Sequence, residues 1–168
     1  MFKVNDFVVK SNIGVCQIVG EEEKQAAPGY SKEKYFLLKS VDGKLTVYQP
    51  VKSADKFLKP VMSKKEAEGF IDELSGLEYS WNNDDKNRIG ELRKKVENNP
   101  SVEAVGVVLG GYYKRLADGK SISRADKNFL TELENKLFSV LGFSLDCDND
   151  EVRDRFDKSF GVQREDSM

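Results

Sequence analysis

The sequence predicts an α+β protein in which a small, bent β-sheet precedes a bundle of α-helices. In residues 1–60, short apolar segments alternate with polar residues and are separated by turns that contain glycine or proline, which is typical of strands. In the rest of the chain, apolar residues recur every three or four positions behind serine caps, which is typical of helices. The chain has 168 residues, of which 39% are apolar, so it is long and apolar enough to bury a core.

Four or five strands are expected in the N-terminal part. They lie at residues 2–10, 15–20, 35–39 and 45–48, with a candidate fifth strand at 57–61. The pair Asp42-Gly43 is a hairpin signal, and Pro28-Gly29 marks residues 25–31 as an irregular loop. Because so many short strands follow each other closely, we expect a strongly bent sheet or a partial barrel of the SH3/Tudor type.

Four helices are expected in the C-terminal part. They lie at residues 64–75, from Asn83 onward, at 101–117 and from Ser123 to Leu145. Ser63 with Glu66, and Ser123 with Asp126, have the spacing of a capping box, and Asn83 is a candidate N-cap. The boundary between the two parts is expected near residues 60–63.

Two features of this helical part need an explanation. Three glycines, Gly106, Gly110 and Gly111, fall inside one predicted helix, where each costs about 1 kcal/mol relative to alanine. Close helix packing or a break in the helix would account for them. Residues 146–168 are acidic and only weakly amphipathic, and we expect a tail with at most a short helix. Its opening resembles a calcium loop, but Glu151 stands where glycine is required, so a solvated acidic linker is expected there.

Composition excludes several classes of function. The net charge is −2, with +3 in residues 1–60 and −5 in residues 61–168, so any contact with nucleic acid must be a local patch. The chain contains no histidine, which removes Ser-His-Asp and Cys-His catalysis and His-ligated metals. Cys16 and Cys147 lie far apart without a CxxC pattern, and we expect two reduced thiols. We therefore expect no catalytic residue, no metal and no cofactor.

No signal of membrane insertion or export is found in the sequence. The first residues form a polar strand pattern instead of a signal peptide, and no apolar run approaches the length of a transmembrane helix. We expect a cytoplasmic protein without membrane contact or small-molecule substrate, acting as a monomer.

The single tryptophan, Trp81, lies in one of the most polar stretches, residues 79–88, at the junction between the two kinds of pattern. Its ring either packs on the helical bundle or contacts something outside the protein. The second interpretation rests on Lys86 and Arg88, which are spaced to lie near the start of a helix, where backbone N–H groups favour phosphate oxygens. An apolar wedge beside such cations is typical of proteins that press into a DNA minor groove.

Other basic residues could extend a phosphate-binding track, although such clusters are also common on solvated faces. Arg93, Lys94 and Lys95 follow on the same predicted helix, and Lys114-Arg115 near the end of the next helix is a further candidate.

Four segments, in their order and spacing, resemble the CarD/CdnL family of bacterial transcription regulators, whose N-terminal module is similar to the polymerase-interacting domain of transcription-repair coupling factor. The first is residues 2–9 followed by Gly14-Val15, and the second is residues 45–50. The third is the pattern of Trp81 with the charged residues at 84, 86 and 88, and the fourth is residues 122–130. The chain departs from the family pattern at Asn5, which replaces a glycine, and at Tyr48, where arginine is frequent.

The resemblance implies a Tudor-like domain at residues 1–61 that binds the β-subunit lobe of RNA polymerase, with Lys24 and Tyr48 at the contact. It also implies a helical domain at residues 62–145 that touches promoter DNA upstream of the −10 region, where the Trp81 ring enters the minor groove and Lys86 and Arg88 hold phosphates. Such a protein is a transcription regulator and not an enzyme. The alternative is a polymerase-binding adaptor whose helical domain recruits another protein, with Trp81 as a hot spot.

Overall fold

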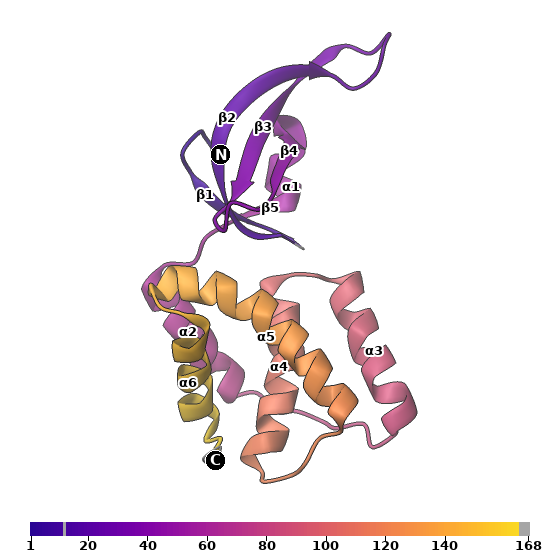
Figure 1. Cartoon of the computed structure of the whole chain (residues 1–168), viewed down its shortest axis with the longest axis vertical. Coiled ribbons are helices and arrows are strands. Elements are labelled where there is room, and N and C mark those ends of the chain that lie inside the picture. The colour runs from indigo at the N-terminus through magenta and orange to yellow at the C-terminus, as the bar shows by residue number, and fades with distance from the viewer. Residues whose placement is uncertain (12, 165–168) are drawn as a thin grey trace. The chain divides into compact units, whose positions relative to one another are not determined.

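The computed structural model describes residues 1–11 and 13–164, and it divides into two compact units, Met1–Val61 and Met62–Met168. The first unit is an antiparallel sheet and the second is helical, so the α+β class predicted from the sequence is confirmed (Figure 1). No helix among the described residues combines the length and the hydropathy needed to cross a bilayer.

Five antiparallel strands form the sheet, in the order β4-β3-β2-β1-β5. They are β1 (Phe7–Lys10), β2 (Gly14–Gln25), β3 (Lys32–Ser40), β4 (Thr46–Pro50) and β5 (Leu58–Pro60). Between β4 and β5 the chain forms a 3-10 turn, η1 (Val51–Ser53), and one helical turn, α1 (Ala54–Phe57). One face of the sheet encloses a small core, to which the following buried residues belong: Val8, Cys16, Ile18, Phe36, Leu38, Ala54 and Leu58.

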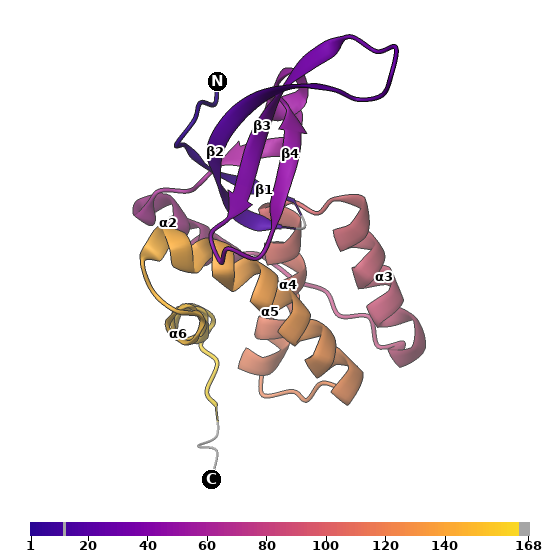
Figure 2. The ribbon, with the colours of Figure 1, turned by 45° about the horizontal axis from the view of Figure 1, so that its top comes forward.

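The β2–β3 hairpin is longer than the sequence indicates, because residues 21–25 pair with residues 32–36, beyond the predicted strands at 15–20 and 35–39. Lys24 lies opposite Glu33, and Glu23 lies opposite Lys34. Opposite charges across an antiparallel pair stabilise it, but a segment that is polar on both faces gives no apolar alternation from which a strand can be predicted. Figure 2 shows β2, β3 and β4 side by side, with the hairpin extending beyond β4.

Asn5 occupies a position for which glycine is better suited. Its φ is 80°, in the left-handed region, where asparagine is among the few tolerated side chains. This conformation lets its N–H donate to the Ile18 carbonyl at 2.7 Å while the Ile18 N–H donates to Asp6 at 2.9 Å. Asn5 therefore adopts a backbone conformation that glycine also adopts readily.

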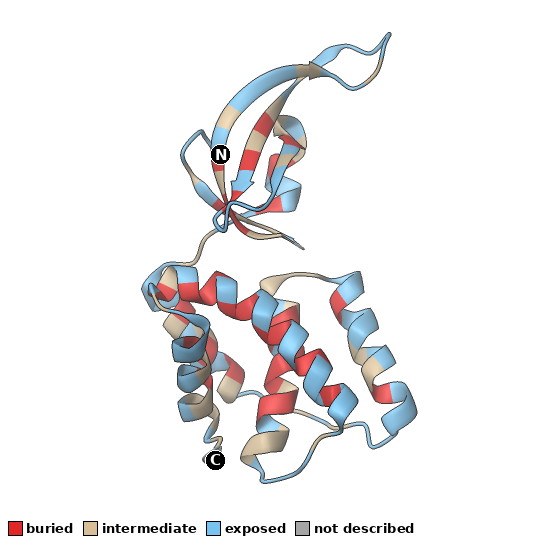
Figure 3. Cartoon of the chain, viewed as in Figure 1, coloured by how far each residue is buried: buried red, intermediate tan, exposed pale blue. Residues whose placement is uncertain are grey.

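Five helices form the second unit as far as it is described, up to residue 164. They are α2 (Lys64–Ser75), α3 (Asp85–Asn98), α4 (Val102–Ala117), α5 (Arg124–Leu145) and α6 (Asn149–Phe160). The two capping boxes predicted from the sequence, at Ser63 and Ser123, are confirmed. Asp84 caps α3, one residue later than predicted, because its carboxylate accepts from the Lys86 N–H. Figure 3 shows buried residues along most of α4 and α5, whereas α3 is exposed over most of its length.

Residues 149–160 contain the short helix that the sequence left open for the acidic tail, and this helix is part of the bundle. They form α6, a full helix of the bundle, in which Val152 and Phe156 are completely buried. The Phe156 ring lies 5.2 Å from that of Phe138 and 5.4 Å from that of Tyr113, between ring centroids. Val152, Phe156 and Phe160 recur every four residues, and this narrow apolar stripe was obscured by the acidic residues around it. Residues 165–168 of the predicted tail lie outside the described residues.

The glycines of α4 mark close packing, with no break in the helix. A Cβ on Gly106 would lie 2.7 Å from the Phe70 ring, and one on Gly110 would lie 2.7 Å from Tyr79 Cζ. Tyr79 cannot move freely, because its hydroxyl donates to the Leu74 carbonyl at 2.7 Å. A Cβ on Gly111 would lie 3.7 Å from the same tyrosine, an ordinary contact distance.

Alanine substitutions at the two adjacent glycines should therefore have opposite effects. We expect Gly110→Ala to lower the free energy of unfolding by about 1–3 kcal/mol, because the new methyl group displaces Tyr79. Gly111→Ala should raise it by up to about 1 kcal/mol, because it removes the cost of glycine in a helix without a clash. Urea denaturation of both variants measures the two values. Equal changes in the free energy of unfolding for the two variants would show that the contact with Tyr79 is not the reason for glycine at position 110.

Candidate functional site

Trp81 lies in the segment that connects α2 to α3. Its ring meets Tyr112 edge-on, with 5.5 Å between the ring centroids, and packs against the bundle core. The side chain is nevertheless only partly buried. The ring thus packs on the bundle and also keeps an accessible surface, and its contact with something outside the protein stays a prediction.

Two arginines lie over the indole. The Cζ atom of Arg88 is 4.5 Å from the ring centroid and that of Arg115 is 4.7 Å from it, distances at which a guanidinium is attracted to the ring. The two cations differ in their surroundings, and this difference decides which of them is available to a ligand.

Arg88 is committed to the interior. Its side chain is 3% exposed and binds both carboxylate oxygens of Asp126, through Nε at 3.1 Å and through Nη2. Its Nη1 donates to the Asn82 carbonyl at 3.0 Å and to Asp85 at 2.7 Å. The prediction that Arg88 holds a phosphate is corrected on this point, because its guanidinium is enclosed and paired with carboxylates inside the bundle.

Arg115 is the cation beside Trp81 that has no carboxylate partner among the described residues. Its side chain is partly exposed, and its Nε donates to the Ser121 carbonyl at 3.3 Å. The sequence indicated Arg115 only as a secondary candidate. Arg115 lies 34 positions after Trp81 in the chain, so their contact cannot be predicted from local spacing. The position of Arg115 near the end of an apolar helix was the one available signal.

Asp126 is the centre of a buried hydrogen-bond network. It is completely buried and accepts hydrogen bonds from the Tyr112 hydroxyl at 2.8 Å and the Ser123 hydroxyl at 2.7 Å, besides those from Arg88. Burial alone would raise the pKa of this carboxyl, but the hydrogen bonds from Arg88, Ser123 and Tyr112 outweigh it and lower the pKa to about 2. Burial, together with the Asp126 carboxylate, raises the pKa of Tyr112. Asp126 is therefore ionised at neutral pH.

The other predicted DNA contacts are exposed on α3 but do not form one cluster. Lys86 lies in the first turn and Lys94 in the third, and both are exposed. Arg93 pairs with Glu132 at 3.0 Å, and its guanidinium lies over the Phe129 ring, so it is directed toward α5. Lys95 lies at a cleft on the other side of the helix.

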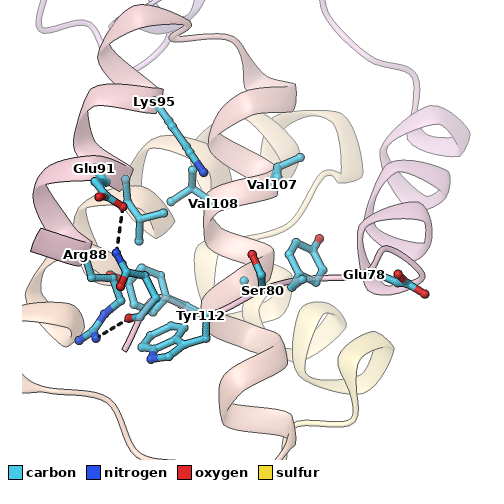
Figure 4. A pocket seen from close by; sticks show the side chains of 13 residues that line it. Glu78, Ser80, Arg88, Glu91, Lys95, Val107, Val108 and Tyr112 are labelled. Atoms are coloured by element: carbon cyan, nitrogen blue, oxygen red, sulfur yellow. Dashed lines mark hydrogen bonds between the residues drawn. The ribbon is translucent and has the colours of Figure 1, made fainter. Parts of the chain in front are cut away.

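This cleft lies between α3, α4 and the segment that carries Trp81, and its volume is about 300 Å³. Figure 4 shows Lys95 and Glu91 reaching toward it from α3, opposite Val107 and Val108 on α4. The lining residues are Glu78, Tyr79, Ser80, Trp81, Asn82, Arg88, Glu91, Leu92, Lys95, Val107, Val108, Gly111 and Tyr112.

In the first unit, the two residues predicted to bind polymerase lie in contact. The Lys24 Nζ on β2 is 3.5 Å from the ring centroid of Tyr48 on β4, and the Tyr48 hydroxyl donates to Glu22 at 3.4 Å. Tyr35 on β3 meets the Tyr48 ring edge-on, with 6.4 Å between centroids. Tyr35 was missed from the sequence, although its alternation with the buried Phe36 indicates that it faces away from the core.

These side chains form a partly exposed surface on the outer face of β2, β3 and β4, here called the tyrosine face: Glu22, Lys24, Tyr35, Leu37 and Tyr48. It combines aromatic rings with a cation, a composition that is typical of protein-binding surfaces. Within residues 1–11 and 13–164, no three His, Cys, Asp or Glu side chains are arranged to hold a metal ion.

Residues 2–62 match the family model for the CarD-like/TRCF RID domain. Domains of this kind are modules that interact with the β subunit of RNA polymerase. The match covers the sheet unit, including the whole tyrosine face. The comparison with curated proteins found no match.

The Arg88–Asp126 pair should dominate the acid sensitivity of the helical unit. Replacing Asp126 by asparagine leaves the Arg88 charge buried without its counter-ion, so we expect the free energy of unfolding at pH 7 to fall by about 3–5 kcal/mol. Because the pKa of Asp126 in the folded state, about 2, lies below its ordinary value, this carboxylate stabilises the fold above about pH 4. That contribution, about 2 kcal/mol, is lost as the pH falls toward 2.

Urea denaturation at several pH values between 2 and 7 measures this effect. The difference between wild type and Asp126→Asn should shrink as the pH falls below 4. The exposed Asp154 provides the matched control, and Asp154→Asn should change neither the stability nor its pH dependence appreciably. A difference that stays constant over this range would contradict the assignment.

Proposed function

Because the chain is a CarD-like family member whose residues 2–62 form a CarD-like/TRCF RID domain, we propose that it is a non-enzymatic transcription regulator that holds promoter DNA open while bound to the polymerase β subunit. Its coarse role follows from the domain, since a protein with this module interacts with RNA polymerase in transcription. The contact with DNA is the step that we add. The observation that carries it is the partly exposed Trp81 beside Arg115, a cation without a carboxylate partner among the described residues.

The tyrosine face is the proposed contact with the β-subunit lobe. At the strand position of Tyr48, relatives frequently carry arginine, and here Lys24 brings its ammonium group to 3.5 Å from the centre of the Tyr48 ring. A positive charge is thus retained close to that position although the strand residue itself is neutral. Aromatic rings that carry a cation bury well against a protein surface with acidic groups.

Trp81 is the proposed wedge. Unstacking a base step costs a few kcal/mol, and a large planar side chain placed in the minor groove recovers part of this cost. Arg115 and the exposed Lys86 are the cations that would meet the neighbouring phosphates, while Arg88, which is bound to Asp126 in the interior, holds the indole on the bundle. Binding to polymerase through the other unit raises the effective concentration of the wedge at the promoter, so weak intrinsic affinity for DNA suffices. This agrees with the net charge of −2.

Removing the indole should shorten the lifetime of the open complex without loss of polymerase binding. For Trp81→Ala we expect a lifetime about tenfold shorter on purified polymerase, which corresponds to about 1.4 kcal/mol of lost stabilisation. Leu77→Ala removes an exposed apolar side chain elsewhere in the same unit and should have no such effect. Equal open-complex lifetimes for wild type and Trp81→Ala would contradict the wedge role of Trp81. If Trp81→Ala instead abolished binding of another protein, the adaptor role would be favoured.

Reversing the charge on the tyrosine face should weaken the contact with polymerase. We expect Lys24→Glu to reduce binding to the isolated β lobe by about tenfold or more, because like charges then face each other. Lys34→Glu makes the same charge change on the opposite face of the same hairpin, since Lys34 pairs with Glu23 and not with Glu22, and it should bind nearly as well as wild type. Equal losses for both variants, measured by pull-down or calorimetry, would mean that the tyrosine face is not the contact.

A further inference from the structure

The cleft beside Trp81 is not explained by the wedge alone. We propose that it is a nucleobase pocket, which receives one base from the promoter strand after Trp81 has unstacked it. This inference rests on the proposed function, because it requires Trp81 to reach DNA. It adds a binding site and a kind of ligand that the wedge does not need.

The walls and the floor of the cleft suit a planar ring. The Trp81 ring contributes aromatic surface and is held edge-on by the buried Tyr112, and Leu92 and Val107 contribute apolar surface beside it. Bases stack on such surfaces with little dependence on sequence, because every base has a π-face. The volume of about 300 Å³ lies at the small end of ligand pockets, which span about 300–1,000 Å³, so the cleft suits a single ring system better than a stack of bases.

Polar groups at the rim are free to bind the edge of a base. The side chains of Lys95 and Glu78 make no hydrogen bond or ion pair within the described residues, and Glu91 uses one oxygen to accept from Asn82 at 2.9 Å. A carboxylate accepts from the amino groups of bases, and an ammonium donates to their carbonyl groups. Figure 4 shows the Lys95 side chain extending across the opening toward Val108.

The charge of the cleft favours a base that belongs to a strand over a free nucleotide. The charge of Arg88 is matched by Asp126, which leaves two carboxylates, Glu78 and Glu91, against Lys95. The phosphates of a free nucleotide would be repelled by these carboxylates if they entered with the ring. A base on a DNA strand enters alone and leaves its phosphates outside the cleft, where Arg115, which contacts Trp81 but is not part of the lining, can meet them.

A variant that fills the cleft can test this proposal while Trp81 stays in place. Val107 is 45% exposed and lines the cleft, so the larger side chain of Val107→Phe occupies part of the cleft at little cost to the fold. Leu77 is 41% exposed and lies outside the lining, so Leu77→Phe is the matched control. Lys95→Met is a second variant, which removes the donor at the rim without filling the space.

The measurement is the lifetime of the open complex on a set of promoters, each of which lacks the base at one nucleotide near the upstream edge of the bubble. With wild-type protein, we expect one abasic position at which the stabilisation by the protein falls about fivefold or more. Val107→Phe should cause the same loss on intact DNA and no further loss at that abasic position, because both changes remove the same contact. Lys95→Met should show a smaller loss that depends on the same position.

Three results would overturn the inference. The first is that Val107→Phe and Leu77→Phe give equal open-complex lifetimes on every template. The second is that no abasic position changes the lifetime with wild-type protein. Either result would mean that no base occupies the cleft. If Val107→Phe shortened the lifetime by the same factor on every template, the cleft would receive a group from a protein instead. All three are distinguishable from failure of the proposed function, in which Trp81→Ala itself leaves the lifetime unchanged.

Discussion

The helical unit depends on one buried carboxylate that three helices share. Asp126 completes the capping box of α5, accepts from Tyr112 on α4 and binds the guanidinium of Arg88 on α3. A buried ion pair contributes little net stability over an apolar substitute, but loss of one partner is costly, so it favours one arrangement of the helices over others. Trp81 takes its place from this arrangement, since its ring lies over Arg88 and edge-on to Tyr112.

A second buried charge plays a similar part at the other end of the bundle. Glu134 is 6% exposed and accepts from the Tyr113 hydroxyl at 2.5 Å and from Arg153 on α6 at 3.4 Å. Together with the buried Phe156, this contact makes α6 a part of the bundle. Adjacent tyrosines on α4 thus serve two separate networks, one that positions the indole and one that closes the fold.

The sequence predicted what depends on local chemistry and missed what depends on distant partners. The caps at Ser63 and Ser123 were identified because a capping box is complete within four residues. The environment of Arg88 was not, because its partner Asp126 is 38 positions away and a buried arginine has the same sequence signature as an exposed one. Similarly, the contact of Lys24 with Tyr48 crosses β3, so only the family resemblance brought the two residues together.

The rigidity of the Trp81 indole favours binding in a groove. A side chain that must be ordered when it enters a groove loses conformational entropy at that moment, and this loss weakens binding. Trp81 is already ordered by Tyr112 and by two guanidinium groups, so under the proposed function little of this cost remains. The separation of roles between the arginines follows from the same reasoning: the cation that fixes the ring must be neutralised inside the protein, and the one that meets phosphate must not be. Arg88 and Arg115 meet these two requirements at nearly equal distances from the ring.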